Sequence, residues 1–135
     1  MKNKHNDNSF QSNDYCDTEL VIGLVNSVGT DSKILLDILS DRLKVFHYKV
    51  EIIKVSQHVI QQLIDYKISY ESEYERISKY MNLGNELRES TKQNSILALG
   101  ITSEIYKRRN KDEKSNPVPM ERTAYIIDSL KHPDE

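Results

Sequence analysis

The sequence predicts an α/β fold with a short parallel sheet, and three observations support this class. Residues 19–25 are continuously apolar after Glu19 and contain β-branched side chains, and a similar apolar run at residues 124–127 is followed by Asp128. Between these runs, residues 35–46 place apolar side chains at helical spacing, and residues 48–55 alternate between apolar and charged. Strands of parallel sheets are covered on both faces and therefore read as continuous apolar runs. The order of elements favours a three-layer fold in which helices cover a parallel sheet.

The first predicted strand, residues 19–25, leads through a loop into a helix. Its continuous apolar run indicates a central strand, and the loop after it begins at Asn26. Either Thr30 or Asp31 is available to cap the exposed N–H groups at the helix start. The buried face of this helix is expected to carry Leu35, Ile38, Leu39, Leu43 and Phe46.

The second predicted strand, residues 48–55, lies nearer a sheet edge than the first, because its apolar residues alternate with charged ones. It completes a strand, helix, strand unit. Parallel strands require such a crossover, and the crossover is right-handed almost without exception. We therefore expect the first two strands to run parallel in one sheet.

A helical segment is inserted between the second and third strands. Its first part, residues 57–66, should bury one face formed by Val59, Ile60, Leu63 and Ile64. Ser72 and Glu75 match the S-x-x-E capping box, which opens a longer helix. The apolar residues expected to be buried on that helix are Tyr74, Ile77, Met81 and Leu87.

A third helix follows, with Asn94 as its expected cap and with the basic residues 107–109 at its carboxyl end, where they complement the helix dipole. Its buried residues are expected to be Leu97, Ile101 and Ile105. Residues 110–120 contain charges of both signs and two prolines, which predicts a surface loop before the last strand.

Composition limits the classes of function. The formal net charge of −2 provides no broad basic field, so nucleic acid is not indicated as a partner. The only cysteine, Cys16, rules out a disulfide framework or a multi-thiolate zinc site within this chain. No apolar run approaches the roughly 18 residues that span a bilayer, and no signal peptide is recognisable. We expect a cytoplasmic protein with no membrane contact, in which residues 1–17 form a flexible polar tail and residues 18–135 form one domain.

The loop from Gly23 to Asp31 joins a buried strand to a helix start, where backbone N–H groups and the helix dipole favour an anion. Aligned on Gly29, the phosphate-loop pattern G-x-x-x-x-G-K-[ST] places Thr30 at the lysine and Asp31 at the hydroxyl. The lysine that clamps the phosphates is therefore missing, and the nearest one, Lys33, lies inside the helix. The loop either binds a nucleotide or is a tight strand-to-helix connection. Its candidate nucleotide-binding residues are Gly23, Asn26, Ser27, Gly29, Thr30 and Asp31.

Asp128 is the candidate metal ligand, because P-loop NTPases use a strand-end aspartate to hold the Mg²⁺ of the bound nucleotide. In the alternative interpretation it only caps the following turn through Ser129 or nearby N–H groups. The sequence has four histidines, His5, His47, His58 and His132. They are not spaced as zinc ligands are, so they do not indicate a zinc site. Five arginines could contact phosphate: Arg76, Arg88, Arg108, Arg109 and Arg122. The alternative is that they lie on solvated helix faces, which carry such residues routinely.

Three segments, residues 20–31, 74–88 and 122–133, resemble the anti-phage deoxycytidylate deaminase family. In that family a P-loop-kinase-like N-terminal domain precedes a zinc-dependent deaminase domain. The deaminase converts deoxycytidine nucleotides to deoxyuridine nucleotides and so depletes the pool during phage infection. The resemblance covers about residues 19–135, and the last of the three segments is the most specific.

The resemblance implies an incomplete P-loop NTPase or kinase-like fold, truncated at its C-terminal end and lacking the deaminase domain. That domain needs an H-x-E element and a P-C-x-x-C element to hold zinc, and neither occurs in this chain. Family roles carry over only to the loop from Gly23 to Asp31 and to Asp128. A truncated gene, a fragment, and a partner of a separately encoded deaminase half all remain open.

The leading hypothesis is a non-catalytic, nucleotide-binding regulatory domain for antiviral defence, with a nucleotide and Mg²⁺ as ligands and a deaminase domain or a second copy as partner. The chain alone is then not expected to be an enzyme. One alternative is a small nucleotide kinase-like phosphotransferase, against which the missing lysine argues. Another is an incomplete domain that acts as an interaction module through an unfinished sheet.

Overall fold

The computed structural model describes residues 18–135, so the predicted tail at residues 1–17 lies outside the described residues. The predicted α/β class is confirmed. In chain order the elements are β1 (Leu20–Val25), α1 (Lys33–Val45), β2 (Lys49–Lys54), the π-helix η2 (Val55–Ile60), α2 (Gln61–Leu63), α3 (Glu73–Thr91), α4 (Ile96–Arg108) and β3 (Thr123–Leu130). Within this part of the chain, no helix is both long and apolar enough to cross a membrane.

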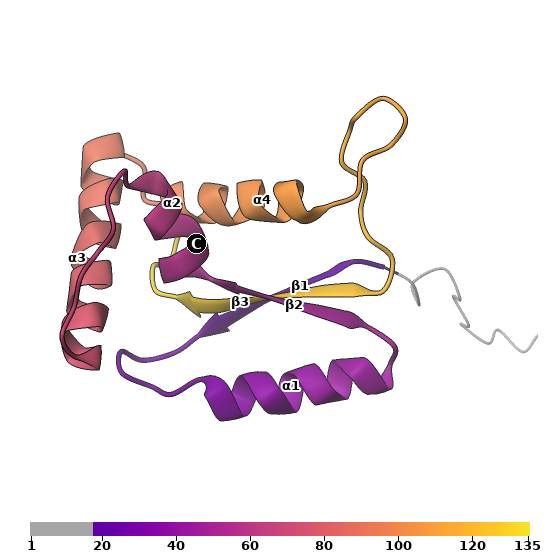
Figure 1. Cartoon of the computed structure of the whole chain (residues 1–135), viewed down its shortest axis with the longest axis horizontal. Helices are drawn as coiled ribbons and strands as arrows, with labels where there is room; N and C mark the ends of the chain where they lie inside the picture. Colours follow the sequence, from indigo (N-terminus) through magenta and orange to yellow (C-terminus); the bar gives the residue numbers. More distant parts are fainter. Residues whose placement is uncertain (1–17) are drawn as a thin grey trace, which may run out of the picture.

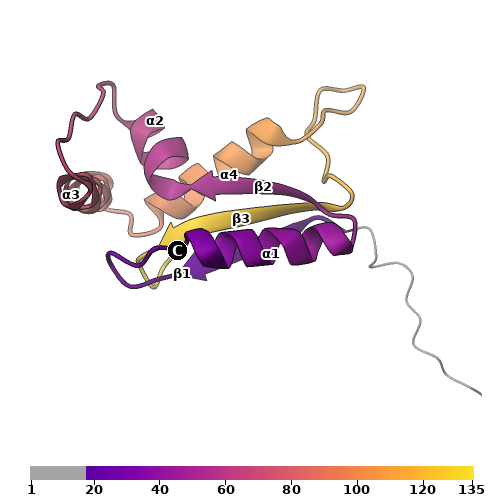
Figure 2. The same ribbon diagram turned by 60° about the horizontal axis from the view of Figure 1, so that its bottom comes forward.

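The three strands form one parallel sheet in the order β1-β3-β2. Helix α1 lies on one side of the sheet, while η2, α2 and α4 lie on the other, with α3 farther out beyond them (Figure 1). Figure 2 shows the same layers from another side, with α1 alone on its face. The expectation that the first two strands run parallel in one sheet is confirmed, and β3 lies between them.

The prediction that the first strand is central was wrong, because β1 is an edge strand of the described sheet. Burial alternates along β1 instead of being continuous, and the side chain of Val25 is 77% exposed. The central position goes to β3, where residues 123–128 are all buried. An apolar run indicates that a strand can be buried, but it does not predict the position of that strand in the sheet, which here depends on the insertion of β3 between β1 and β2.

The main core lies between the sheet and the layer formed by η2 and α4. It contains Tyr125 and Ile127 of β3 together with Ile53, Val55, Val59, Ile60, Leu97, Ile101 and Ile105. Successive side chains of a strand point to opposite faces, so Ala124 and Ile126, both fully buried, face α1. Both faces of β3 are therefore covered, as the sequence run predicted. The predicted burial of Leu97, Ile101 and Ile105 on α4 is also confirmed.

Several predicted helix faces were wrong. Helix α1 buries Leu36 and Ser40. Three of the residues that were expected to be buried on this helix, Leu35, Ile38 and Phe46, are exposed. Helix α3 buries only Gly84, and Tyr74 is 82% exposed. These helices contact the molecule through a narrower stripe than their apolar content suggests. The segment expected as a helix at residues 57–66 is a π-helix followed by a short α2, and Leu63 is exposed.

Of the three predicted helix caps, one occupies the expected position. The Ser72 side chain accepts a hydrogen bond from Glu75 N at 3.2 Å, which confirms that the box opens α3. Neither Thr30 nor Asp31 occupies the cap position of α1, which is Ser32, but Asp31 Oδ1 accepts a hydrogen bond from Lys33 N at 2.9 Å. Asn94 does not cap α4, because Ser95 occupies the cap position and its side chain makes no capping bond.

Ion pairs at the end of α4 join the helix to the sheet. Arg108 bonds Glu104 Oε1 at 2.8 Å and lies 3.3 Å from Glu51 Oε2 on β2. Arg109 pairs with Glu19 at the start of β1, and Glu19 also accepts a bond from Met120 N at 2.8 Å. The basic cluster at residues 107–109 thus fastens layers together in addition to lying at the helix end.

We expect Glu19→Gln to lower the free energy of unfolding by about 1.5–3 kcal/mol at pH 7, because it removes a charge-assisted acceptor. Burial by itself raises the pKa of Glu19, but hydrogen bonds from Arg109 and from Met120 N outweigh burial and lower it. A lowered folded-state pKa stabilises the protein above the unfolded pKa of about 4.3, and this contribution disappears as the pH falls through the folded pKa. Urea unfolding at pH 7 and pH 3 should therefore show a difference from wild type that shrinks in acid.

The matched control is Glu113→Gln, which removes the same charge from the exposed loop before β3. It should leave stability within about 0.5 kcal/mol of wild type. Equal effects of the two substitutions at pH 7 would contradict a structural role for the Glu19 pair.

Candidate functional site

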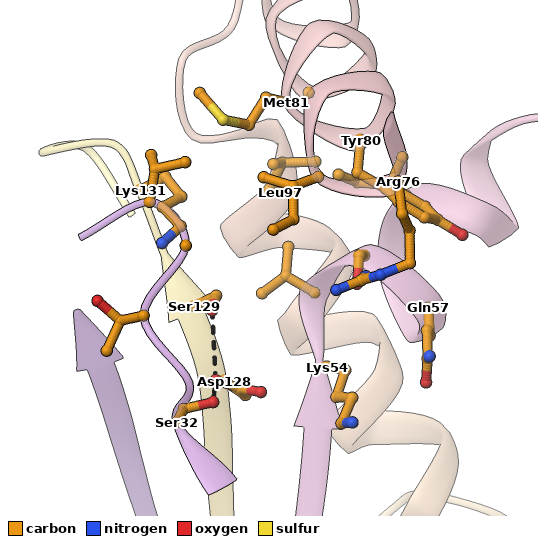
Figure 3. A pocket seen from close by; sticks show the side chains of 18 of the residues that line it. Ser32, Lys54, Gln57, Arg76, Tyr80, Met81, Leu97, Asp128, Ser129 and Lys131 are labelled. Carbon is orange, nitrogen blue, oxygen red and sulfur yellow. Dashed lines mark hydrogen bonds between the residues drawn. The ribbon is translucent and has the colours of Figure 1, made fainter. Parts of the chain in front are cut away.

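A cavity of about 1080 Å³ lies at the carboxyl ends of the three strands. Its walls come from the loop after β1, the start of α1, the end of β2 with η2, one face of α3 and the segment after β3. Parallel strands all end at the same edge of a sheet, and α/β proteins bind ligands in the crevice there. Leu97 of α4 also lines the cavity, so the topology brings segments that are far apart in the sequence to one place (Figure 3).

The loop between β1 and α1 is held by its own hydrogen bonds. Thr30 N donates to Ser27 O at 3.2 Å, and the hydroxyls of the same two residues lie 2.7 Å apart. Gly29 has φ of 80°, which glycine adopts without steric cost. The Asp31 carboxylate accepts a hydrogen bond from Lys33 N. One N–H that a phosphate could use at the start of the helix is therefore already bound to a carboxylate of the chain.

Asp128 lies at the floor of the cavity and is 8% exposed. Its Oδ1 accepts hydrogen bonds from Ser32 Oγ at 2.9 Å and from Ser129 Oγ at 3.3 Å (Figure 3). None of the ion pairs found within residues 18–135 includes Asp128. The result is a buried carboxylate that is bound by hydroxyls and is not neutralised by a cation of the described chain.

The strand that carries Asp128 is irregular at this point. It was expected to end at Asp128 but continues to Leu130, and its pairing with β1 shifts register between Gly23 and Val25. Ser129 has φ of 74°, in the left-handed region that residues with a Cβ rarely adopt. Bulges and strained residues of this kind are concentrated next to functional sites. The irregularity places the Ser129 hydroxyl beside the Asp128 carboxylate.

The structure brings most of the predicted site residues together. Those that line the cavity are Ser27, Gly29, Thr30, Asp31 and Asp128. Gly23 and Asn26 do not line it. A Cβ on Gly23 would lie 2.7 Å from Leu130 Cδ1, so Gly23 packs against the side chain at the end of β3. Asn26 O accepts a bond from Lys131 Nζ at 2.7 Å, which joins the ends of β1 and β3.

Of the five arginines considered for phosphate contact, Arg76 and Arg88 line the cavity, and so does Lys33 of α1. The sequence analysis did not assign Lys54 or Lys131 to the site. Lys54 ends β2, Arg76 and Arg88 lie on α3, and Lys131 follows β3. The guanidinium of Arg76 is paired with Glu73, whose hydrogen bond raises the pKa of Arg76. No hydrogen bond or ion pair is found for the Lys54 ammonium within the described residues. Its place at a strand end was the one signal that could have identified Lys54.

The cavity has two chemically different ends. The polar end carries Asp128, Ser32 and Lys54, and the other end is walled by side chains of α3 and α4 (Figure 3). The apolar and aromatic residues of that second end are Ile60, Ile77, Tyr80, Met81 and Leu97. The charged side chains of Arg76 and Arg88 on α3 line the cavity beside them. Such a cavity can accept a ligand that has an anionic part and an apolar or aromatic part.

Comparisons of the chain with protein-family models, with curated proteins and with solved structures found no match. Among residues 18–135 no group of three or more His, Cys, Asp or Glu side chains is arranged to hold a metal ion. Asp128 would therefore have to bind a cation together with oxygen atoms of a ligand and water.

We expect Ser129→Gly to be more stable than Ser129→Ala by about 0.5–1 kcal/mol. Both substitutions remove the hydroxyl, and only glycine relieves the positive φ, an advantage that is partly offset by the greater freedom of glycine in the unfolded chain. Urea unfolding of the two variants measures the difference directly. Equal stability would mean that the backbone at this position is not strained.

Proposed function

We propose that this chain is a non-catalytic nucleotide-binding domain that regulates an anti-phage nucleotide deaminase. The observation that carries the proposal is the bond from Ser32 Oγ to Asp128 Oδ1 at 2.9 Å, at the polar end of the cavity. In P-loop NTPases a Ser or Thr of the loop and a strand-end Asp together hold the Mg²⁺ of the nucleotide. The sequence alignment put Asp31 at the hydroxyl position, whereas Ser32, one residue later, makes this contact.

The chemistry of Asp128 suits Mg²⁺. This ion keeps several waters and binds proteins through one or two carboxylates together with the phosphates of the substrate. Asp128 Oδ2 takes part in no hydrogen bond found among residues 18–135, so one carboxylate oxygen is available. A cation here would neutralise a buried negative charge, and the hydroxyl of Ser32 would lie beside it.

Cations from other elements can replace the lysine that the loop lacks. Lys54 comes from β2 and Lys131 from the segment after β3, and both line the cavity with the loop. The Lys54 ammonium can contact phosphate from outside the loop, in the role that a loop lysine has elsewhere, whereas the Lys131 ammonium donates to Asn26 O at 2.7 Å and would have to leave it first. The apolar end formed in part by Met81 and Leu97 would then take the nucleoside.

The regulatory role and the deaminase partner rest on the family resemblance. Phosphoryl transfer depends on positive groups and N–H donors that are already positioned around the phosphates. In this loop one such donor, Lys33 N at the start of α1, is hydrogen-bonded to Asp31. These contacts favour binding over catalysis. The kinase-like alternative predicts phosphoryl transfer in a coupled assay with nucleoside monophosphates as acceptors.

We expect nucleoside triphosphates or deoxycytidine nucleotides to raise the unfolding midpoint of the chain in the presence of Mg²⁺. A ligand at a hundred times its Kd stabilises the folded state by about 2.7 kcal/mol. Asp128→Asn should abolish the part of the shift that depends on Mg²⁺, since the substitution removes the carboxylate charge. The matched control is Asp65→Asn, an exposed position outside the cavity, which should retain the full shift.

Differential scanning fluorimetry with each nucleotide, with and without Mg²⁺, measures these shifts. A cooperative transition that no nucleotide moves would rule out the proposed ligand. A shift that survives Asp128→Asn unchanged would show that the metal is held elsewhere.

A second candidate function, an interaction module, is favoured by the exposed side of β1. This strand has no partner on its outer edge within the described sheet, and Val21 and Val25, on the same side of the strand, are both exposed. Edges of this kind can pair with another chain. The occupant we propose is a second copy, whose β1 would pair with the first across a two-fold axis.

We expect light scattering after size exclusion to show a dimer, and Val25→Lys to weaken it at least tenfold because lysine on an edge strand opposes strand pairing and the two copies would bring like charges together. Val118→Lys, a similar change in the loop before β3, should leave the dimer intact. A sharp monomer peak for the wild type at all concentrations would exclude this second function.

A further inference from the structure

The carboxylate of Glu135 is buried in the wall of the cavity, although Glu is a residue type that is seldom buried. Its side chain is 1% exposed and pairs with Arg88 of α3 through Oε1. Its Oε2 accepts bonds from Lys131 N at 3.0 Å and from His132 N at 3.2 Å. Three donors from two distant segments of the chain therefore surround one anionic group.

These three donors form a seat, here called the anion seat, consisting of the Arg88 guanidinium and the N–H groups of Lys131 and His132. Adjacent backbone N–H groups that point to one side bind anions in many proteins, and a guanidinium matches carboxylate or phosphate with two N–H groups at once. The anion seat has the composition of a phosphate site, and in this structure a side chain of the chain itself occupies it.

Glu135 does not use every donor of the anion seat. The Arg88 side chain is 11% exposed, and its Nη1 donates to Asn85 Oδ1 at 3.1 Å. Its Nε is buried and has no hydrogen-bond partner within the described residues. A buried N–H without an acceptor is costly, and a tetrahedral anion with more oxygen atoms than a carboxylate can supply one.

The anion seat belongs to the same cavity as the loop after β1 and Asp128. Arg88, Lys131, His132 and Glu135 all line it, and the Lys131 ammonium bonds the end of β1. A ligand with several phosphates can thus reach the anion seat while it remains in the cavity.

We propose that the anion seat binds a phosphate group of the ligand. In the ligand-free protein the Glu135 carboxylate occupies the same donors, and the phosphate displaces it. The inference rests on the proposed function for the identity of that ligand as a nucleotide. The same exchange replaces the Arg88–Glu135 pair, which links α3 to the segment after β3, with a bridge through the ligand. Ligand binding is thereby coupled to the position of α3.

The test is calorimetric titration of the full chain with inorganic tripolyphosphate. In Glu135→Gln the side chain that the phosphate displaces is neutral and binds the arginine less strongly, so we expect tripolyphosphate to bind at least tenfold more tightly than to wild type. Glu113→Gln removes the same charge far from the cavity and should bind within twofold of wild type. Equal affinities of the two variants would overturn the proposal.

A second measurement uses the wild type, which does not depend on the folding of any variant. Tripolyphosphate should shift the backbone amide resonances of Lys131 and His132, with saturation at the same concentration as in calorimetry. Arg88→Lys keeps the charge but loses the two-pronged donor, and its affinity should fall at least tenfold. Saturable binding that leaves both amides unmoved would place the anion elsewhere and overturn the proposal.

The outcomes separate this inference from the proposed function. Nucleotide stabilisation that depends on Asp128 but is unaffected by Glu135→Gln would contradict the displacement of Glu135 and leave the nucleotide site in place. Tighter tripolyphosphate binding to Glu135→Gln, without any nucleotide effect on unfolding, would support the anion seat and contradict the nucleotide.

Discussion

Strand β3 is hydrogen-bonded along both edges and buried on both faces, and the arrangement of the other elements depends on it. Because β1 and β2 each pair with β3, the loop after β1 and the π-helix after β2 lie on either side of its carboxyl end. Residues 123–127 are buried and do not line the cavity, so Asp128 is the first residue of this strand to reach it.

The charges of the cavity come from tertiary structure rather than from one motif. The loop after β1 contributes an acid, Asp31, and hydroxyls, while the cations come from the start of α1, β2, α3 and the segment after β3. An anionic ligand would therefore hold together elements that otherwise share few contacts. Helix α3 in particular packs on α4 and η2 and reaches the segment after β3 through the pair of Arg88 and Glu135.

The sequence was a good guide where the determining interaction is local. The run before Asp128 is buried on both faces, and Ser72 caps its helix, because these outcomes depend on neighbouring residues. The edge position of β1, the exposure of Tyr74 and the joining of Arg88 to Glu135 depend on where distant segments pack. Site residues in the loop and at the strand end were predicted for the same local reason, while the cations from β2, α3 and the last segment carry no local signature.

The strand order also has a consequence for how the sheet assembles. The two edge strands do not pair with each other, so neither can form a ladder until β3, which lies about seventy residues after β2 in the chain, has been inserted between them. Such long-range pairing is slow because the entropy cost of closing the long loop must be met before any stabilising contact between the strands forms. During synthesis, β1 and β2 leave the ribosome well before their shared partner, and their unpaired edges must be kept apart for that interval.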